Sequence, residues 1–186
     1  MASVLDERAE IEREIAGRTV CDQLLKVAEE HPDDPAYSDR TGDGWATLTF
    51  AQARRRVLEI AAGFAALGVQ PGDAIALMMP NRSEHVLADL GAVHARALPC
   101  TVYATFAPEQ VAYVAKDVGA VVAVLGGPAD LARWEPVLGE LPRLRKIIML
   151  EGAPSGDDRF LSWREFRATG AEALAADPGA VEARWR

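Results

Sequence analysis

The sequence has little of what membrane, secreted and disulfide-stabilised proteins depend on. Its 186 residues include two cysteines, Cys21 and Cys100, which lie far apart and form no Cys-x-x-Cys motif. No apolar run approaches the roughly 20 residues that cross a bilayer, and the first thirty residues are too charged for a signal peptide. These absences argue against a membrane span, export and a disulfide framework. We therefore expect a cytoplasmic protein with reduced thiols.

Clustered positive charge and metal-ligand patterns are also missing. The formal net charge is −8, and the 20 Lys and Arg residues never form a basic run of five, so we expect no nucleic-acid partner. His85 and His94 lie nine residues apart on one expected helix and would face opposite sides of it. With no His and Cys cluster elsewhere, we expect no metal site.

Alternating helical and strand patterns fill most of the chain. About half of the residues are apolar and a quarter are charged, with hydrophobic residues at 49% and charged residues at 26%, which is typical of a globular protein. Several expected strands, such as Ala-Val-Val-Ala-Val-Leu at 120–125, are apolar without alternation. That pattern is typical of parallel strands covered on both faces.

These patterns predict an α/β protein with an open doubly wound, largely parallel sheet and flanking helices, preceded by an N-terminal helix and a short β-hairpin. Residues 1–18 would form an N-terminal arm, with a charged helix over 5–17, and residues 19–186 would form one α/β unit. The expected strands are 36–40, 45–48, 74–79, 98–103, 120–125 and 145–150, and the expected helices are 20–30, 50–67, 83–97, 108–118, 128–139 and 163–176. A polar loop is expected between 150 and 163, and a short helical pattern at the end of the chain.

Capping signals support two of these helices. Thr49 with Gln52, and Ser162 with Glu165, have the spacing of capping boxes, in which each side chain bonds the backbone amide of the other residue. Gly68 stands where a left-handed residue would end the helix over 50–67. We expect the four tryptophans, which have no stacking-platform spacing, to lie in the core or at an interface.

Three loops should meet at the carboxyl edge of the sheet, where open α/β proteins bind ligands. In the loop over 80–85, either Asn81 or Ser83 caps the next helix and Arg82 is solvated, or the loop forms a wall of a ligand site. The residues Ser83, His85 and Asp89 diverge on a helix and do not predict a catalytic triad.

The other two loops carry aromatic and glycine residues. In the loop over 103–107, Tyr103 and Phe106 flank small residues, and either pack on the next helix or leave room for a ligand chain near the backbone. In the loop over 126–130, Gly126 and Gly127 form either a tight turn or an anion-binding nest. Neither a GxGxxG motif nor a GxxxxGK[ST] motif is present, so the residues alone predict no self-contained nucleotide site.

Two successive segments resemble the adenylate-forming superfamily. They are LTFAQARRRVLEIAAGFAALGVQPGDAIALMMPNRSEHVLADLGAVHARALPC and, just after it, VYATFAPEQ. Within this group the segment is most similar to the N-terminal portion of bacterial long-chain fatty acid–CoA ligases, over about residues 19–186. The resemblance implies a parent enzyme that joins a fatty acid to coenzyme A through an acyl-adenylate, using ATP, Mg²⁺ and coenzyme A. It also implies a homodimer or other self-association. One departure is Arg96, which stands where the family usually has glycine, and which either interrupts helix–strand packing or reaches into solvent.

The resemblance also implies which residues face coenzyme A. The loop that corresponds to 103–106 lies near the path of the cofactor in the family, and the turn at 126–127 lies near its nucleotide end. Arg133 either meets the phosphates or is a solvated surface residue. The candidate coenzyme A-binding residues are Tyr103, Ala104, Thr105, Phe106, Gly126, Gly127 and Arg133.

No catalytic residue is assigned within the chain. The family's phosphate-binding loop with its lysine, its ribose-binding aspartate and its C-terminal catalytic lysine do not occur in it. We therefore expect an N-terminal α/β subdomain truncated before the ATP phosphate-binding loop, inactive alone and with no cofactor bound. The alternatives are a fragment of a fatty acyl-AMP ligase, which stops at the adenylate, and a stand-alone α/β binding or interaction module.

Overall fold

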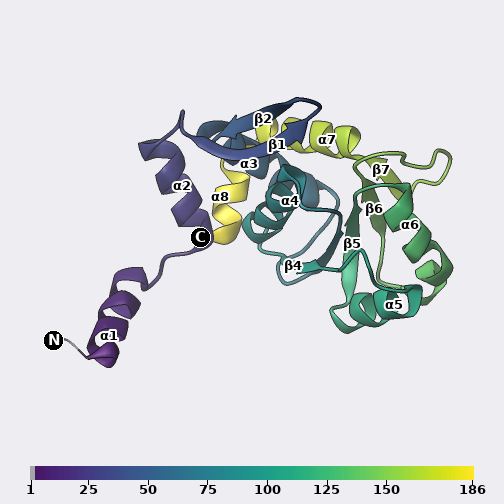
Figure 1. The fold of residues 1–186 in the computed structure, drawn as a ribbon, viewed down its shortest axis with the longest axis horizontal. Helices are drawn as coiled ribbons and strands as arrows, with labels where there is room; N and C mark the ends of the chain where they lie inside the picture. The colour runs from purple at the N-terminus through teal and green to yellow at the C-terminus, as the bar shows by residue number, and fades with distance from the viewer. Residues whose placement is uncertain (1–2) are drawn as a thin grey trace.

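A five-stranded parallel sheet organises residues 3–186, the part of the chain that the computed structural model describes. The strand order is β4-β3-β5-β6-β7, and every neighbouring pair is parallel. Figure 1 shows helices on both faces of this sheet, so the predicted doubly wound α/β architecture is confirmed. The strands are β3 (Ala74–Met78), β4 (Leu98–Thr101), β5 (Ala120–Leu125), β6 (Lys146–Met149) and β7 (Phe160–Ser162).

The central strands are buried on both faces because their side chains alternate between two cores. Ile75 and Leu77 of β3 pack into one core, whereas Ala76 and Met78 pack into the other. Every residue of β3 and of β5 is buried. This explains why the two strands are apolar without alternation in the sequence.

Two layers of helices cover the sheet. The larger layer contains α3 (Phe50–Ala66), α4 (Ser83–His94) and α7 (Trp163–Ala176), with α2 (Val20–Glu30) and the short α8 (Ala180–Trp185) packed against it. The opposite layer contains α5 (Pro108–Asp117), α6 (Pro128–Trp134) and the 3₁₀ helix η1 (Glu135–Glu140). None of the helices within residues 3–186 is long and apolar enough to cross a bilayer.

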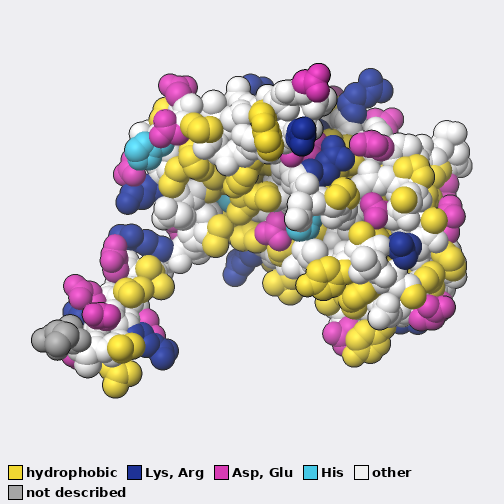
Figure 2. Space-filling view, in the orientation of Figure 1, with side chains coloured by type: hydrophobic (Ala, Val, Ile, Leu, Met, Phe, Trp, Pro, Cys, Tyr) yellow, Lys and Arg dark blue, Asp and Glu magenta, His cyan; other side chains and the backbone are white. Residues whose placement is uncertain are grey.

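The first elements lie outside the sheet. The strands β1 (Pro35–Thr41) and β2 (Gly44–Thr49) form the expected antiparallel hairpin. The helix α1 (Val4–Ile15) has no buried residue and projects from the rest of the molecule (Figure 1). Figure 2 shows hydrophobic side chains on the surface of this helix. The exposed large apolar residues of α1 are Val4, Leu5, Ile11 and Ile15.

One expected helix changes type along its length, and one short strand was not expected. The helix expected over 128–139 is α-helical to Trp134 and continues as η1, because Pro136 has no amide hydrogen to donate to the preceding turn. The strand β7 lies in what we expected to be a polar loop. It has three residues and pairs with β6 alone, which is too short a run to predict from an apolar pattern.

The helix expected over 83–97 ends at His94, because Arg96 adopts a left-handed backbone with φ 61°. The amide of Arg96 donates to the carbonyl of Val93 at 2.9 Å, and the amide of Ala97 donates to that of Ala92 at 2.9 Å. These two bonds form a Schellman motif, in which glycine is the usual left-handed residue. Arg96 is exposed, so the arginine reaches solvent and helix–strand packing is not interrupted.

The predicted capping boxes are confirmed. The side chain of Thr49 accepts from the amide of Gln52, and that of Ser162 accepts from the amide of Glu165. Gly68 is left-handed, with φ 77°. Of the tryptophans, Trp134 is fully buried in the core, whereas Trp45 on the hairpin is 70% exposed.

Candidate functional site

The strand order places a candidate site at the carboxyl ends of β3 and β5. The chain moves from β3 to β4 on one side and then returns to β5 on the other. In open α/β sheets, ligands bind beyond the carboxyl ends of the strands at such a reversal. The loop after β3, the loop after β4 and the turn after β5 therefore line this edge, as the sequence predicted.

The loop after β3 is fixed by the hairpin. Ser83 is buried, and its amide donates to Asp39 Oδ1 at 2.9 Å. The hydroxyl of Ser83 also donates to Oδ2 of Asp39. Asp39 therefore caps α4 from a distant strand, and the prediction that Asn81 or Ser83 caps this helix is wrong. The sequence gives no signal for a cap residue that lies 44 positions away.

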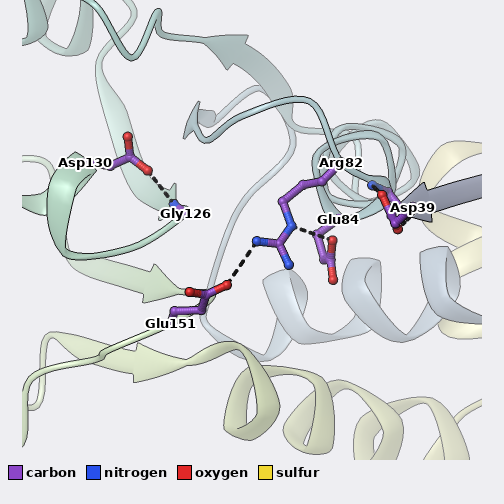
Figure 3. Close-up of polar contacts among 7 residues, drawn as sticks. Asp39, Arg82, Glu84, Gly126, Asp130 and Glu151 are labelled. Atoms are coloured by element: carbon purple, nitrogen blue, oxygen red, sulfur yellow. Dashed lines mark hydrogen bonds and ion pairs between the residues drawn. The ribbon is translucent and has the colours of Figure 1, made fainter. Parts of the chain in front are cut away.

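Arg82, in the same loop, is bound by two carboxylates. Its Nε lies 2.8 Å from Glu84 Oε2, and its Nη1 lies 3.3 Å from Glu151 Oε1 (Figure 3). The hydrogen bond with Glu84 raises the pKa of the arginine. Arg82 is thus held between two carboxylates, and the expectation that it is solvated is wrong. Glu151, at the end of β6, could not be linked to it from the sequence because 69 residues separate them.

The glycine turn after β5 is bonded to a carboxylate of its own chain. The amide of Gly126 donates to the carbonyl of Met78 at 2.9 Å and to Asp130 Oδ2 at 3.1 Å (Figure 3). A Cβ at position 126 would lie 2.7 Å from that same oxygen, so glycine is needed for this close approach. Burial raises the pKa of Asp130. The neighbouring Gly127 is extended, with φ 179°.

The loop after β4 is more exposed. The ring of Tyr103 is 67% exposed and meets the ring of Phe106 edge-on, with centroids 5.5 Å apart. Ala104 and Thr105 between them are also exposed. The guanidinium of Arg133 donates from Nη1 to the carbonyl oxygen of Phe106 at 3.0 Å. Arg133 therefore points to the loop, which the sequence left open.

The structure brings five of the seven candidate coenzyme A-binding residues together. Arg133 and the residues from 103 to 106 form one group, joined by the bond to Phe106. Gly126 and Gly127 lie at the end of β5, which β3 separates from β4. The Gly126 amide already has two acceptors, so the exposed loop and Arg133 fit a phosphate-bearing ligand better than this amide does.

A polar groove of about 810 Å³ runs beside the loop after β3. Its walls come from the hairpin, α3 and the start of α4. They include the side chains of Arg40, Arg56, Arg82 and Glu84. Figure 2 shows Lys and Arg side chains near the hairpin and α4.

The described residues contain no evident catalytic set. Within residues 3–186, no three His, Cys, Asp or Glu side chains converge in a way that could hold a metal ion. All three lysines already have partners. Lys26 pairs with Glu30, Lys116 pairs with Glu140, and Lys146 donates to the carbonyl of Asp158. The arrangement can hold a ligand at the edge of the sheet, where the hydroxyl of Thr101, at the end of β4, lies 3.2 Å from Nε2 of His85 in α4.

Comparison with known proteins identifies the family. The model of the AMP-binding enzyme family matches residues 24–181, which is most of the chain. The chain belongs to the AMP-binding enzyme family. These are adenylate-forming ligases, as the resemblance of the stretch after Thr49 implied.

Relatives in the AMP-binding family fall into two groups by length. The uncharacterized Mycobacterium tuberculosis protein Rv1549 is 32% identical over 155 residues, which cover 83% of this chain and 85% of Rv1549. The Drosophila melanogaster long-chain-fatty-acid–CoA ligase heimdall is 28% identical over 88% of this chain and 25% of the ligase. A salicyl-AMP ligase of M. tuberculosis is 31% identical over 88% of this chain and 30% of that enzyme. The chain thus spans about a quarter to a third of these two ligases.

Solved structures agree on the fold. The anthranilate CoA ligase AuaEII, in complex with anthranoyl-AMP, matches with a TM-score of 0.67 at 22% identity, over 80% of this chain and 26% of the ligase. The coronafacic acid ligase of Pectobacterium brasiliense matches with a TM-score of 0.71 at 14% identity, over 80% of this chain and 29% of that protein.

Proposed function

We propose that this chain is the N-terminal α/β part of an ATP-dependent long-chain fatty acid–CoA ligase. The family match over residues 24–181 carries the proposal, together with identities of 28% to heimdall and 31% to the FadD15 ligase of Mycobacterium bovis. In the parent, the fatty acid carboxylate attacks the α-phosphate of ATP and pyrophosphate leaves. The thiol of coenzyme A then displaces AMP from the acyl-adenylate.

Within this parent, we assign the chain to the coenzyme A side of the site. Tyr103 is exposed beside the small exposed residues Ala104 and Thr105, which leaves room for an extended ligand chain, whereas Phe106 is half-buried and packs against the core. Arg133 uses one nitrogen to bond the carbonyl of Phe106. Its remaining N–H groups are available for a phosphate oxygen. Gly126 and Gly127 would contribute close approach of the backbone at the neighbouring edge.

We further propose that the chain is inactive by itself. Transfer of an adenylyl group requires preorganised donors and a cation around the phosphates. The three lysines, Lys26 in α2, Lys116 near the end of α5 and Lys146 at the start of β6, lie outside the loops at the carboxyl edge of the sheet. ATP and Mg²⁺ would therefore be held by parts of the parent outside this chain. The test is ATP–pyrophosphate exchange by the purified chain, and measurable exchange would contradict the proposal.

Two alternatives have specific support. A fatty acyl-AMP ligase parent is favoured by the similarity to salicyl-AMP ligase. Products formed by the full-length protein with and without coenzyme A distinguish it, since such a parent makes acyl-AMP and no acyl-CoA. A stand-alone binding module is favoured by Rv1549, of which this chain covers 85%. A reading frame that continues past residue 186 into a Ser/Thr/Gly-rich loop with a lysine would exclude the module.

Self-association also follows as a proposal. The helix α1 exposes four large apolar side chains, Val4, Leu5, Ile11 and Ile15. Exposed apolar surface of this kind favours a protein partner. We expect a homodimer or larger assembly in light scattering, and a monomeric mass at high protein concentration would contradict it.

A further inference from the structure

The N-terminal helix α1 carries an apolar row beside an acidic row. Three exposed apolar residues follow one face of the helix at i, i+7 and i+11, namely Val4, Ile11 and Ile15. Three exposed glutamates lie on the adjoining face at i, i+3 and i+7, namely Glu7, Glu10 and Glu14. Within residues 3–186, none of these three carboxylates forms a hydrogen bond or an ion pair, whereas Glu12 pairs with Arg8 at 2.7 Å. Neither row therefore has a partner among the described residues of its own chain.

The position of α1 prevents it from folding back over the larger helix layer. Four residues, 16–19, join α1 to α2, and they span at most about 14 Å. Cys21, Leu24 and Ala28 of α2 are buried, so this helix is fixed in place. Figure 1 shows α1 and α7 well apart, with α2 and α8 between them. A site on α7 can thus be reached only by α1 of another molecule.

The surface that α3 and α7 share has apolar ground for such a helix. The two helices approach closely, and a Cβ at Gly170 of α7 would clash with the carbonyl oxygen of Glu59 of α3. A hollow of about 430 Å³ opens on this surface. Its apolar lining consists of Leu150, Trp163, Ala168 and Ala171.

The same surface, which we call the α3–α7 face, is basic. Arg164 and Arg167 line the hollow, and Arg56 lines a neighbouring one of about 240 Å³ that shares Arg167 and Glu59 with it. The buried Glu59 is already occupied, because it lies 2.7 Å from Arg167 Nη2 and 3.2 Å from Arg55 Nε. Across residues 3–186, Arg56 and Arg164 form neither a hydrogen bond nor an ion pair. The α3–α7 face thus offers apolar surface flanked by two unpaired cations, in a chain whose net charge is −8.

We propose that α1 of one copy docks on the α3–α7 face of a second copy. The apolar row packs into the hollow against Leu150 and Trp163, and the glutamates of the acidic row pair with Arg56 and Arg164. An amphipathic helix in a groove of matching polarity is a recurrent mode of recognition. Because each copy carries both surfaces, two reciprocal contacts close a dimer. This contact rests on the proposed self-association and is independent of the ligase activity.

The first test is the mass of the purified chain in sedimentation velocity, at several protein concentrations and at low and high sodium chloride. We expect a dimer whose dissociation constant rises with salt, because salt screens charges on an exposed face. A dimer that salt does not weaken would contradict the pairing of charges. A monomer would overturn both this contact and the proposed self-association, and would leave the α3–α7 face to the rest of the parent or to another protein.

Charge reversal tests each surface separately. The acid variant carries Glu7→Lys and Glu14→Lys, and the arginine variant carries Arg56→Glu and Arg164→Glu. Each should weaken the dimer at least about tenfold, because like charges then meet at both contacts. A dimer that neither variant weakens would overturn the docking of α1 on this face and leave self-association itself standing.

Two further variants serve as controls of charge and of apolar contact. Asp33→Lys with Asp43→Lys makes the same change of charge as the acid variant in exposed turns, and should dimerise like the original chain. Ile11→Ala shortens the apolar row without touching the core of its own chain, and should weaken the dimer at least about fivefold. Equal weakening by the Asp33 and Asp43 pair and by the acid variant would overturn the site.

Mixing the two charge variants is the decisive measurement. In the mixed pair, the arginines of the acid variant meet the native glutamates of the other chain, and its lysines meet the introduced glutamates. Opposite charges then face each other at both contacts, so the equimolar mixture should dimerise under conditions in which neither variant does alone. A mixture that stays monomeric would overturn the proposal.

The variants are chosen so that folding does not obscure the result. The substitutions in α1 spare the core, since this helix has no buried residue. If the arginine variant fails to fold, Arg164→Glu alone, which changes an exposed side chain, replaces it in the mixture, and the same outcomes decide.

Discussion

The loops that follow β3 and β4 lie at the same edge of the sheet but are held in different ways. The loop after β3 is tied by Asp39 of the hairpin, by Glu84 and by Glu151. The loop after β4 leaves Tyr103 exposed, and one bond from Arg133 reaches its backbone from another element. We infer that the loop after β3 holds the hairpin and α4 in place, whereas the loop after β4 is free to contact a ligand.

The largest change in stability should come from removing the hydrogen bonds that Asp39 of the hairpin accepts from Ser83 of α4. Asp39→Ala removes the cap of α4 and leaves the buried Ser83 amide and hydroxyl without an acceptor. We expect a loss of about 2 kcal/mol in the free energy of unfolding, measured by urea denaturation. The control is Asp43→Ala in the exposed hairpin turn. Equal stability of the two variants would show that the first loop is not held by Asp39.

A pH-dependent change in the free energy of unfolding should come from Asp130, whose carboxylate accepts from the amide of Gly126 in the turn after β5. Burial raises the pKa of Asp130 above its reference value of 3.8, so the folded state favours the protonated carboxyl. The stability that this preference contributes is present below pH 3.8 and is lost as the pH rises through the folded pKa. Asp130→Asn should therefore gain stability relative to the original chain as the pH rises across that window.

The measurement is a series of urea denaturations of both proteins from acid to neutral pH. At each pH we compare the free energies of unfolding of the two proteins. Their difference isolates Asp130, because the other carboxyl groups titrate equally in both. A difference that stays constant with pH would contradict the raised pKa. Asp157→Asn is the control, since a hydrogen bond from Arg159 lowers the pKa of that exposed carboxyl and the sign of its pH dependence is opposite.

A smaller gain in stability should come from replacing Arg96, in the turn between α4 and β4. Arg96→Gly removes the cost of a left-handed non-glycine residue, offset in part by the greater freedom of glycine in the unfolded chain. We expect a net stabilisation of about 0.5–1 kcal/mol, seen as a higher midpoint in thermal denaturation. Arg96→Ala, which keeps the strain, should be close to neutral. A gain in Arg96→Ala equal to that in Arg96→Gly would mean that the strain at this residue is not the cause.

The smallest effect on stability should come from the loop after β4. Arg133→Ala removes one bond to the exposed segment 103–106, and we expect a loss of about 0.5 kcal/mol. Hydrogen exchange should become faster at the amides of this loop and remain unchanged at those of 80–84. Faster exchange in both loops would mean that they are coupled and would contradict the conclusion that they are held independently.

The sequence predicted the sheet, the hairpin and the helix caps at Thr49 and Ser162, because these depend on side chains close together in the chain. It also placed the ligand loops at one edge, because parallel strands end together. It missed the contacts of Asp39 and Glu151, since partners 44 and 69 residues away leave no local signal. It missed β7, whose three residues are a strand through pairing with β6.

The most direct test of the account uses Arg133→Ala in the full-length protein that contains this chain. Adenylation is measured by fatty-acid-dependent ATP–pyrophosphate exchange, and thioester formation by the dependence of acyl-CoA production on coenzyme A. Loss of a phosphate contact should raise the KM for coenzyme A by roughly 10- to 150-fold and leave adenylation nearly unchanged. If adenylation and thioester formation fall together, or if neither changes, the assignment of the loop after β4 to coenzyme A is wrong.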